Sequence, residues 1–178
     1  RALTRHLRIN GAMRGIISTE ELDPEKLVAK ANQLPTMEGQ NLADTVTSET
    51  CYAWQDGKPA PVDVSDGYKW SDKGPRLVLV DYGVKWNILR LLDEQGFEVL
   101  SVPSHYSEEQ VRALKPDAIF LSNGPGDPAV LDHAVKNAKS YCEDLPVAGI
   151  CLGHQILGQA LGGKAFKLKF GHHGCNHP

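Results

Sequence analysis

The stretch RLVLVDYGVKWNILRLLDEQGFEVLSVP, residues 76–103, places a helix pattern between two apolar strand patterns. Residues 76–83 form a near-continuous apolar run, which is typical of a strand buried on both faces of a sheet. Residues 85–96 carry apolar side chains at helical spacing and end at Gly96, a residue suited to a helix C-cap. Residues 97–103 predict a second strand. This order predicts two parallel strands joined by a helical crossover.

The same alternation continues to residue 163. Ser107 and Gln110 fit the pattern of a capping box and predict a helix that ends before Pro116. Four repeats of strand and helix predict an α/β fold with a doubly wound, mostly parallel sheet of the flavodoxin type, in which ligands bind beyond the carboxyl ends of the strands. The remaining elements are expected as strands at residues 117–122 and 145–150, a helix within residues 129–142, and a helix after residue 150 that ends at Gly162 and Gly163.

The part of the chain before residue 75 looks like an incomplete, smaller α+β domain followed by a linker. Residues 55–75 concentrate Gly, Pro and Asp without periodicity, which is typical of a connection between two units, so we expect a boundary near Gly74. The elements expected before that connection are a helix at residues 2–9, a strand at residues 13–18, and a helix with Asp23 as N-cap and Pro24 at its first position.

Composition excludes several classes of protein. The chain has 178 residues, of which 41% are hydrophobic, so it can bury a core. The sequence contains no apolar run of about 20 residues and no secretion signal, which predicts a cytoplasmic protein without membrane contact. The 19 basic and 22 acidic residues are nearly balanced, so we expect no nucleic-acid partner. The four cysteines lack C-x-x-C spacing, which fits a reducing compartment.

Cys151 stands between two glycines at the end of the fourth expected strand. The residues Gly149, Cys151 and Gly153 have the G-x-C-x-G spacing of a nucleophile elbow, in which a sharp turn directs the side chain outward. The N-terminus of the following helix favours an anion and therefore a reactive thiolate. The alternative is a small hydrophobic cysteine buried at the end of a core strand. The spacing alone leaves both interpretations open.

A second loop, SNGPGDP at residues 122–128, follows the neighbouring expected strand. It lacks the third glycine of a dinucleotide-binding loop and is not a P-loop. The backbone amides of Gly124 and Gly126 are free to face a ligand, and one of them could form an oxyanion hole with the amide of Leu152. A single donor of this kind contributes about 3 kcal/mol to acyl transfer. The alternative is a tight connection without a catalytic role.

Several motifs resemble those of class I, triad-type glutamine amidotransferases. The resemblance rests on GICLGHQILGQALGGK at residues 149–164 and FLSNGPGDP at residues 120–128. KFGHHGCNHP at residues 169–178, together with RALTRHLRINGAMRGIIS at residues 1–18 and VDYGVKWNILR at residues 80–90, resembles more narrowly the family of small, glutamine-hydrolysing subunits of carbamoyl phosphate synthetases. The resemblance therefore covers essentially the whole chain.

The resemblance implies a fold division and a set of site residues. Residues 1–74 correspond to the C-terminal part of the subunit's N-terminal domain plus a linker, and residues 75–178 to the N-terminal part of the amidotransferase domain. Cys151 would attack the side-chain amide of glutamine, and the backbone amides of Leu152 and Gly124 would hold the oxyanion. The substrate glutamine would be contacted by Gln155 and by the loop that contains Gly126.

The resemblance also implies a partner, a large synthetase subunit that receives the ammonia and uses bicarbonate, ATP and Mg²⁺, while this chain needs no cofactor. The family's catalytic base, a His-x-Glu pair, would lie after Pro178, and a glutamine-binding serine before Arg1. We therefore expect a fragment that is nearly inactive alone. Cys175 replaces a glycine of the family pattern. The sequence does not distinguish between a role in arginine synthesis and a role in pyrimidine synthesis.

Three alternatives compete with this assignment. His154 stands three residues after Cys151 and would be directed along the first helical turn rather than over the thiol, so it is a poor candidate base. The histidines and cysteine of residues 172–177 could bind zinc, but their spacing matches no standard zinc module, and no metal is expected. A noncatalytic module that docks onto a synthetase is the third alternative. Alkylation of Cys151 by a diazo-ketone analogue of glutamine would distinguish it from an enzyme.

Overall fold

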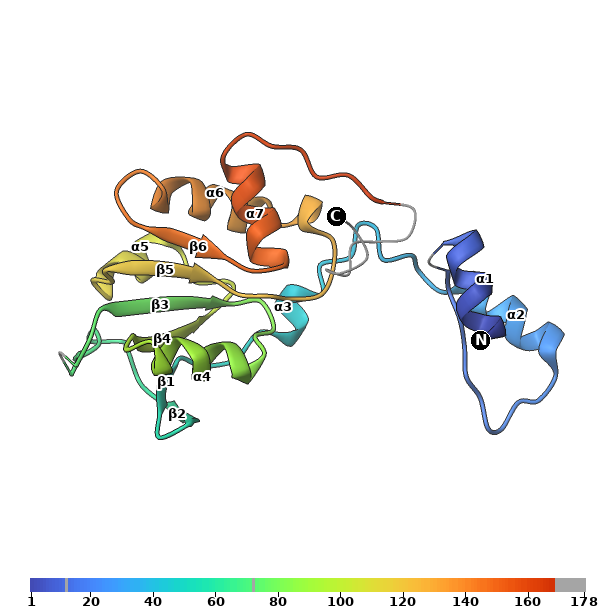
Figure 1. Ribbon diagram of the computed structural model, residues 1–178, viewed down its shortest axis with the longest axis horizontal. Coiled ribbons are helices and arrows are strands. Elements are labelled where there is room, and N and C mark those ends of the chain that lie inside the picture. Colours follow the sequence, from blue (N-terminus) through green and yellow to red (C-terminus); the bar gives the residue numbers. More distant parts are fainter. Residues whose placement is uncertain (12, 72, 169–178) are drawn as a thin grey trace. The chain divides into compact units, whose positions relative to one another are not determined.

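The computed structural model describes residues 1–11, 13–71 and 73–168 (Figure 1). Contacts divide the chain into two compact units. One comprises the described parts of residues 1–37 together with residues 166–168, and the other comprises Glu38–Ala165. Within the described ranges, no helix combines the length and the apolar character that crossing a bilayer requires.

The leading unit contains the two expected helices, α1 (Ala2–Asn10) and α2 (Pro24–Gln33). The Asp23 side chain accepts a hydrogen bond from the Glu25 amide, and Pro24 occupies the first position of α2, as predicted. The strand expected at residues 13–18 is wrong, because the described residues of this stretch have no regular structure. A strand needs a neighbour to pair its backbone groups, and no strand lies among the described residues up to Met37.

The second unit is built on a six-stranded sheet with the order β2-β1-β4-β3-β5-β6. The β3/β4, β3/β5 and β5/β6 pairs are parallel, whereas β1 pairs antiparallel with both β2 and β4. The order of the four parallel strands is that of a flavodoxin-like sheet, so the predicted fold class is confirmed. The strands are β1 (Tyr52–Gln55), β2 (Lys58–Pro61), β3 (Arg76–Asp81), β4 (Glu98–Pro103), β5 (Ala118–Leu121) and β6 (Val147–Gly149).

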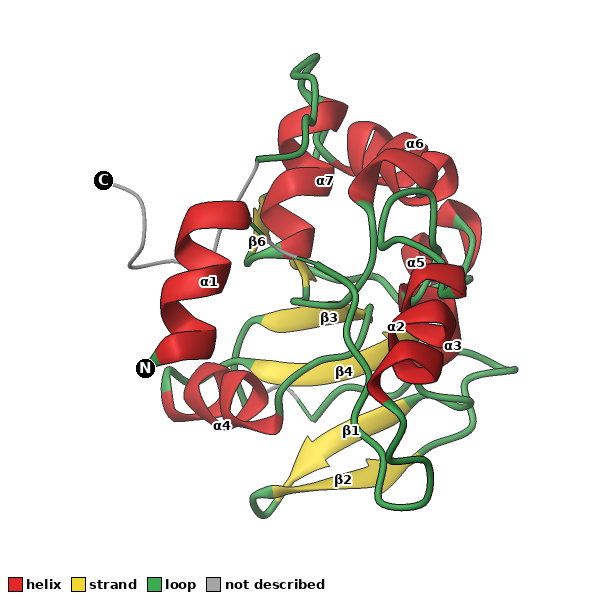
Figure 2. Cartoon of the chain, turned by 90° about the vertical axis from the view of Figure 1, so that its right-hand side faces the viewer, coloured by secondary structure: helices red, strands yellow, loops and turns green. Residues whose placement is uncertain are grey.

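Helices cover both faces of the sheet (Figures 1 and 2). Alternate residues of β3 supply the two cores. Leu77 and Leu79 pack with Leu89 of α4 on one face, while Val78 and Val80 belong to the core shared with α5, α6 and α7 on the other. These helices confirm the predicted alternation: α4 (Trp86–Glu94), α5 (Glu108–Ala113), α6 (Asp132–Tyr141) and α7 (Leu152–Ala160).

The first two strands form a hairpin where the sequence predicted a connection. Asp56 and Gly57 join β1 to β2 with φ values of 51° and 74°. Positive φ at both central residues is the mark of a type I′ turn, for which Asp-Gly is a preferred pair. Contacts therefore group residues 38–74 with the sheet rather than with the leading unit. The domain boundary near Gly74 stays a prediction about the whole protein.

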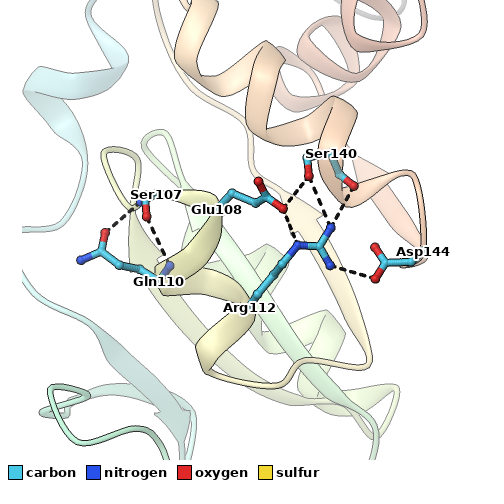
Figure 3. Close-up of polar contacts among 6 residues, drawn as sticks. All are labelled: Ser107, Glu108, Gln110, Arg112, Ser140 and Asp144. Atoms are coloured by element: carbon cyan, nitrogen blue, oxygen red, sulfur yellow. Dashed lines mark hydrogen bonds and ion pairs between the residues drawn. The ribbon is translucent and has the colours of Figure 1, made fainter.

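A polar cluster joins α5 to α6 (Figure 3). Ser107 and Gln110 form the predicted capping box at the start of α5. The Arg112 guanidinium contacts the Glu108 carboxylate, donates to Asp144 Oδ2 at 2.9 Å, and donates to the Ser140 carbonyl oxygen at 3.0 Å. The Arg112 side chain therefore links α5 to α6 and to the turn after α6.

Candidate active site

Cys151 lies at the carboxyl end of β6, immediately before α7, and its side chain is exposed. Its φ of 54° and ψ of −112° are unusual for a residue other than glycine, and such strained conformations persist where the surrounding structure enforces them. The exposure of Cys151 does not fit the alternative of a cysteine buried in the core. The thiol is presented at the edge of the sheet where ligands bind in doubly wound folds.

Two close backbone approaches explain the glycines on either side of Cys151. A methyl group at Gly149 would lie 2.6 Å from the Gly153 carbonyl carbon and oxygen. A methyl group at Gly153 would lie 2.1 Å from the Leu121 carbonyl oxygen. Neither distance leaves room for a Cβ atom, so the sharp turn at Cys151 depends on both glycines.

The loop after β5 is held beside this turn. The Ser122 hydroxyl is buried and accepts a hydrogen bond from the Tyr82 amide at 2.9 Å. A methyl group at Gly124 would lie 2.2 Å from the Tyr82 carbonyl oxygen and 2.9 Å from Leu152 Cδ2. Gly124 and Leu152, the two residues whose amides were expected to hold an oxyanion, are therefore neighbours. Their catalytic role stays a prediction.

The two remaining predicted site residues are Gly126, in the loop after β5, and Gln155, on α7. Gly126 has a φ of 101°, and a methyl group there would lie 2.9 Å from the Gln40 carbonyl oxygen and 3.0 Å from the Leu42 nitrogen. Gln155 is exposed on α7. Its backbone amide donates a hydrogen bond to the Cys151 carbonyl oxygen at 3.1 Å. Gly126 is thus packed against an earlier segment of the chain, and Gln155 stands one helical turn after the thiol.

Asp81 is a polar residue at this edge that the sequence analysis missed. It ends β3, the residue is only 4% exposed, and its carboxylate accepts hydrogen bonds from the backbone amides of Ser48, Gly83 and Val84. The available signal was the carboxylate that closes the apolar run RLVLVD directly before a Tyr-Gly turn. Its pairing with Ser48, 33 residues earlier, leaves no local pattern in the sequence.

The other two described cysteines differ from Cys151 in exposure. Cys51 is buried and Cys142 is half-buried, and burial raises the pKa of both thiols above the ordinary value. A raised pKa keeps a thiol protonated and unreactive at neutral pH. Exposure therefore distinguishes Cys151 from these two thiols.

Two cavities lie elsewhere in the sheet-containing unit. One of about 710 Å³ is lined in part by Cys51, Tyr106 and Gln110, and one of about 470 Å³ in part by Asp44 and His133. Cys151 lines neither of them. In the part of the chain that the structure describes, no group of three His, Cys, Asp or Glu side chains could hold a metal ion. The cluster at residues 172–177 that was weighed as a zinc site lies outside the described residues.

Comparison with known proteins places this chain in a family. The family model for glutamine amidotransferase class-I matches residues 78–178. The whole chain is 97% identical to a stretch of the carbamoyl phosphate synthase small chain of Maridesulfovibrio salexigens, of which it covers 48%. It is 62% identical to 48% of the small chain of Nitratidesulfovibrio vulgaris and 47% identical to 47% of the small chain of Aquifex aeolicus. The chain spans about half the length of these relatives. The chain belongs to the class-I glutamine amidotransferase family.

Proposed function

We propose that this chain forms the nucleophile-bearing half of a carbamoyl phosphate synthase small chain, in which Cys151 hydrolyses glutamine. The observation that carries the proposal is the exposed thiol of Cys151 at a strained strand-to-helix turn, beside the loop that contains Gly124. The family and the near-identity to small chains support the same reaction.

In the proposed reaction, the Cys151 thiolate adds to the side-chain amide carbon of glutamine. A carbon–sulfur bond forms, and the electron pair of the carbonyl moves to its oxygen, which accepts hydrogen bonds from the Leu152 and Gly124 amides. Collapse of this intermediate breaks the carbon–nitrogen bond, and the nitrogen leaves as ammonia after it takes up a proton. Water then cleaves the thioester and releases glutamate. Gln155 and the Gly126 loop orient the substrate.

The proton transfers require a base, which the resemblance assigns to a His-x-Glu pair after Pro178. His154 is exposed on the first turn of α7 and is not assigned this role. Because members of a nucleophile–base unit act together, we propose that residues 1–178 alone hydrolyse glutamine several orders of magnitude more slowly than a complete small chain.

The ammonia is proposed to pass to a large synthetase subunit in the cytoplasm, where ATP, Mg²⁺ and bicarbonate are used to make carbamoyl phosphate for arginine or pyrimidine synthesis. No cofactor is assigned to this chain. The near-identical relative is named a small chain, and a small chain implies a larger partner. Direct transfer would keep ammonia from being lost to solvent.

The experiment uses the complete M. salexigens small chain with residues 1–178 of this chain in place of the stretch that they match, hereafter the full-length chimera, assembled with the large subunit. Cys151→Ser should abolish carbamoyl phosphate synthesis from glutamine and leave synthesis from free ammonia at the parental rate. Retention of glutamine-dependent synthesis by Cys151→Ser would refute the proposal and favour a docking module.

A further inference from the structure

We infer that Asp81 is a positioning residue for glutamine hydrolysis: its buried carboxylate fixes both the turn after β3 and residues 39–48, and these hold the Gly124 loop beside Cys151. Residues 39–48, which include the short helix α3 (Ala43–Val46), are called the 39–48 segment below. The inference rests on the proposed function, because it concerns the same reaction.

The two oxygens of the Asp81 carboxylate serve different parts of the chain. Oδ1 accepts hydrogen bonds from the Gly83 and Val84 amides, both at 2.8 Å, and so closes the turn between β3 and α4. Oδ2 accepts a hydrogen bond from the Ser48 amide at 3.1 Å. Hydrogen bonds to an ionised carboxylate are stronger than neutral ones, and burial of Asp81 shields them from water. One side chain therefore ties the turn to the 39–48 segment.

The turn after β3 in turn holds the Gly124 loop. The Asn123 side chain donates to the Gly83 carbonyl oxygen at 2.9 Å and accepts from the Lys85 amide at 3.0 Å. A methyl group at Gly83 would lie 3.3 Å from Pro125 Cδ and 3.8 Å from the Gly124 Cα. Any displacement of the turn would therefore be transmitted to the backbone of Gly124.

The 39–48 segment holds the far end of the same loop. The Gly39 amide donates to Asp127 Oδ2 at 2.9 Å, and the Asp127 amide donates to the Gln40 carbonyl oxygen at 3.1 Å. At its other end, the Thr47 hydroxyl donates to the Asp81 carbonyl oxygen at 2.6 Å. The segment thus connects Asp81 to Asp127, and the loop between Asn123 and Asp127 is anchored at both ends.

This arrangement predicts a larger effect on the rate of the chemical step than on substrate binding. An oxyanion donor acts only when it is placed correctly for the charged intermediate, and a misplacement of about 1 Å can lower a rate by about 100-fold. Loosening Asp81 would shift the Gly124 amide and the Gly126 backbone of the same loop, while the thiol and Gln155 stay in place. We therefore expect a loss in kcat for glutamine hydrolysis together with a smaller rise in KM, because the same loop contains Gly126.

The test measures glutaminase kinetics and ammonia-dependent synthesis in the full-length chimera assembled with the large subunit. Asp81→Asn keeps one carbonyl oxygen for the turn but replaces one acceptor with a donor, and Asp81→Ala removes both. We expect kcat for glutamine hydrolysis to fall about 10-fold in Asp81→Asn and about 100-fold in Asp81→Ala, with a rise in KM that is smaller than the fall in kcat. Ammonia-dependent synthesis should stay at the parental rate.

The matched control is Asp117→Asn, which alters a carboxylate bonded to Arg76 at the opposite end of β3. It should leave glutaminase kcat unchanged.

If both Asp81 variants keep the parental kcat while Cys151→Ser is inactive with glutamine, the inference is wrong and the proposed function stands. Loss of both glutamine-dependent and ammonia-dependent synthesis in the Asp81 variants would also overturn the inference, because a loss of both activities indicates general misfolding. If Asp81→Ala does not assemble with the large subunit, the kcat of Asp81→Asn decides whether the inference holds. A Cys151→Ser variant that is active with glutamine would refute the proposed function itself.

Discussion

The Gly153 amide donates a hydrogen bond to the Ser122 carbonyl oxygen at 3.0 Å. This bond joins the first turn of α7 to the loop after β5, so the helix that follows Cys151 and the loop that contains Gly124 are fixed to each other. The Ile150 amide adds a second bond, to the Leu121 carbonyl oxygen at 3.1 Å. The spacing of thiol and loop is therefore set by backbone hydrogen bonds where the chain leaves the neighbouring strands β5 and β6.

Replacement of Gly153 should break this arrangement. In Gly153→Val, the new Cβ would be forced to within 2.1 Å of the Leu121 carbonyl oxygen, so α7 must move away from β5. We expect the free energy of unfolding of the full-length chimera to fall by about 2 kcal/mol or more, and glutamine hydrolysis to be lost. Urea unfolding and glutaminase assays measure the two effects.

Gly158→Ala is the matched control on the same helix. Apart from its chain neighbours and the backbone of its own helix, no atom of the described residues lies within 4 Å of the position that its Cβ would take. Alanine favours the helix over glycine, so this variant should gain up to about 1 kcal/mol of stability and keep its activity. If Gly153→Val were as stable and active as Gly158→Ala, the close packing at Cys151 would be disproved.

Arg112 should contribute more to stability than an ordinary surface arginine. Its guanidinium contacts Glu108 of α5, Ser140 of α6 and Asp144 in the turn after α6 (Figure 3). Lysine cannot reproduce this fork of donors, so Arg112→Lys should lower the melting temperature of the full-length chimera by about 2–4 °C. Arg90→Lys is the control, because the Arg90 side chain donates to Asn87 on its own helix. Equal melting temperatures for the two variants would show that the cluster adds nothing to stability.

The pair of Arg76 and Asp117 should make stability depend on acid pH. Hydrogen bonds from Arg76 lower the pKa of Asp117 to about 2. Because the folded pKa lies below the unfolded value of about 3.9, the stabilisation is complete above about pH 4 and is lost as pH falls toward 2. The difference in unfolding free energy between the parent and Asp117→Asn, followed by urea unfolding, should therefore shrink over this range. A difference that is independent of pH would contradict the lowered pKa of Asp117.

Much of the secondary structure was predictable because its signals are local. The apolar run at residues 76–80, the capping box at Ser107 and the N-cap at Asp23 each specify structure within a few residues, and each prediction was confirmed. The G-x-C-x-G spacing also located the strained turn at Cys151.

What the sequence did not reveal depends on distant partners. The strand expected at residues 13–18 had the right composition but lacks a pairing strand among the described residues. The hairpin at Asp56 and Gly57 lay inside a stretch whose prolines and glycines suggested a linker. The 39–48 segment has no apolar periodicity, and its bonds to Asp81 and Asp127 span 33 and 88 residues. Only the folded chain brings these groups together.

The most direct test of Cys151 as the nucleophile is to alkylate the full-length chimera with a diazo-ketone analogue of glutamine. Peptide mass spectrometry then maps the site of alkylation. We expect modification of Cys151, prevented by excess glutamine, and no modification of the buried Cys51 or the half-buried Cys142. An unmodified Cys151, or a Cys151 that reacts at the same rate with and without glutamine, would contradict the assignment of Cys151 as the nucleophile.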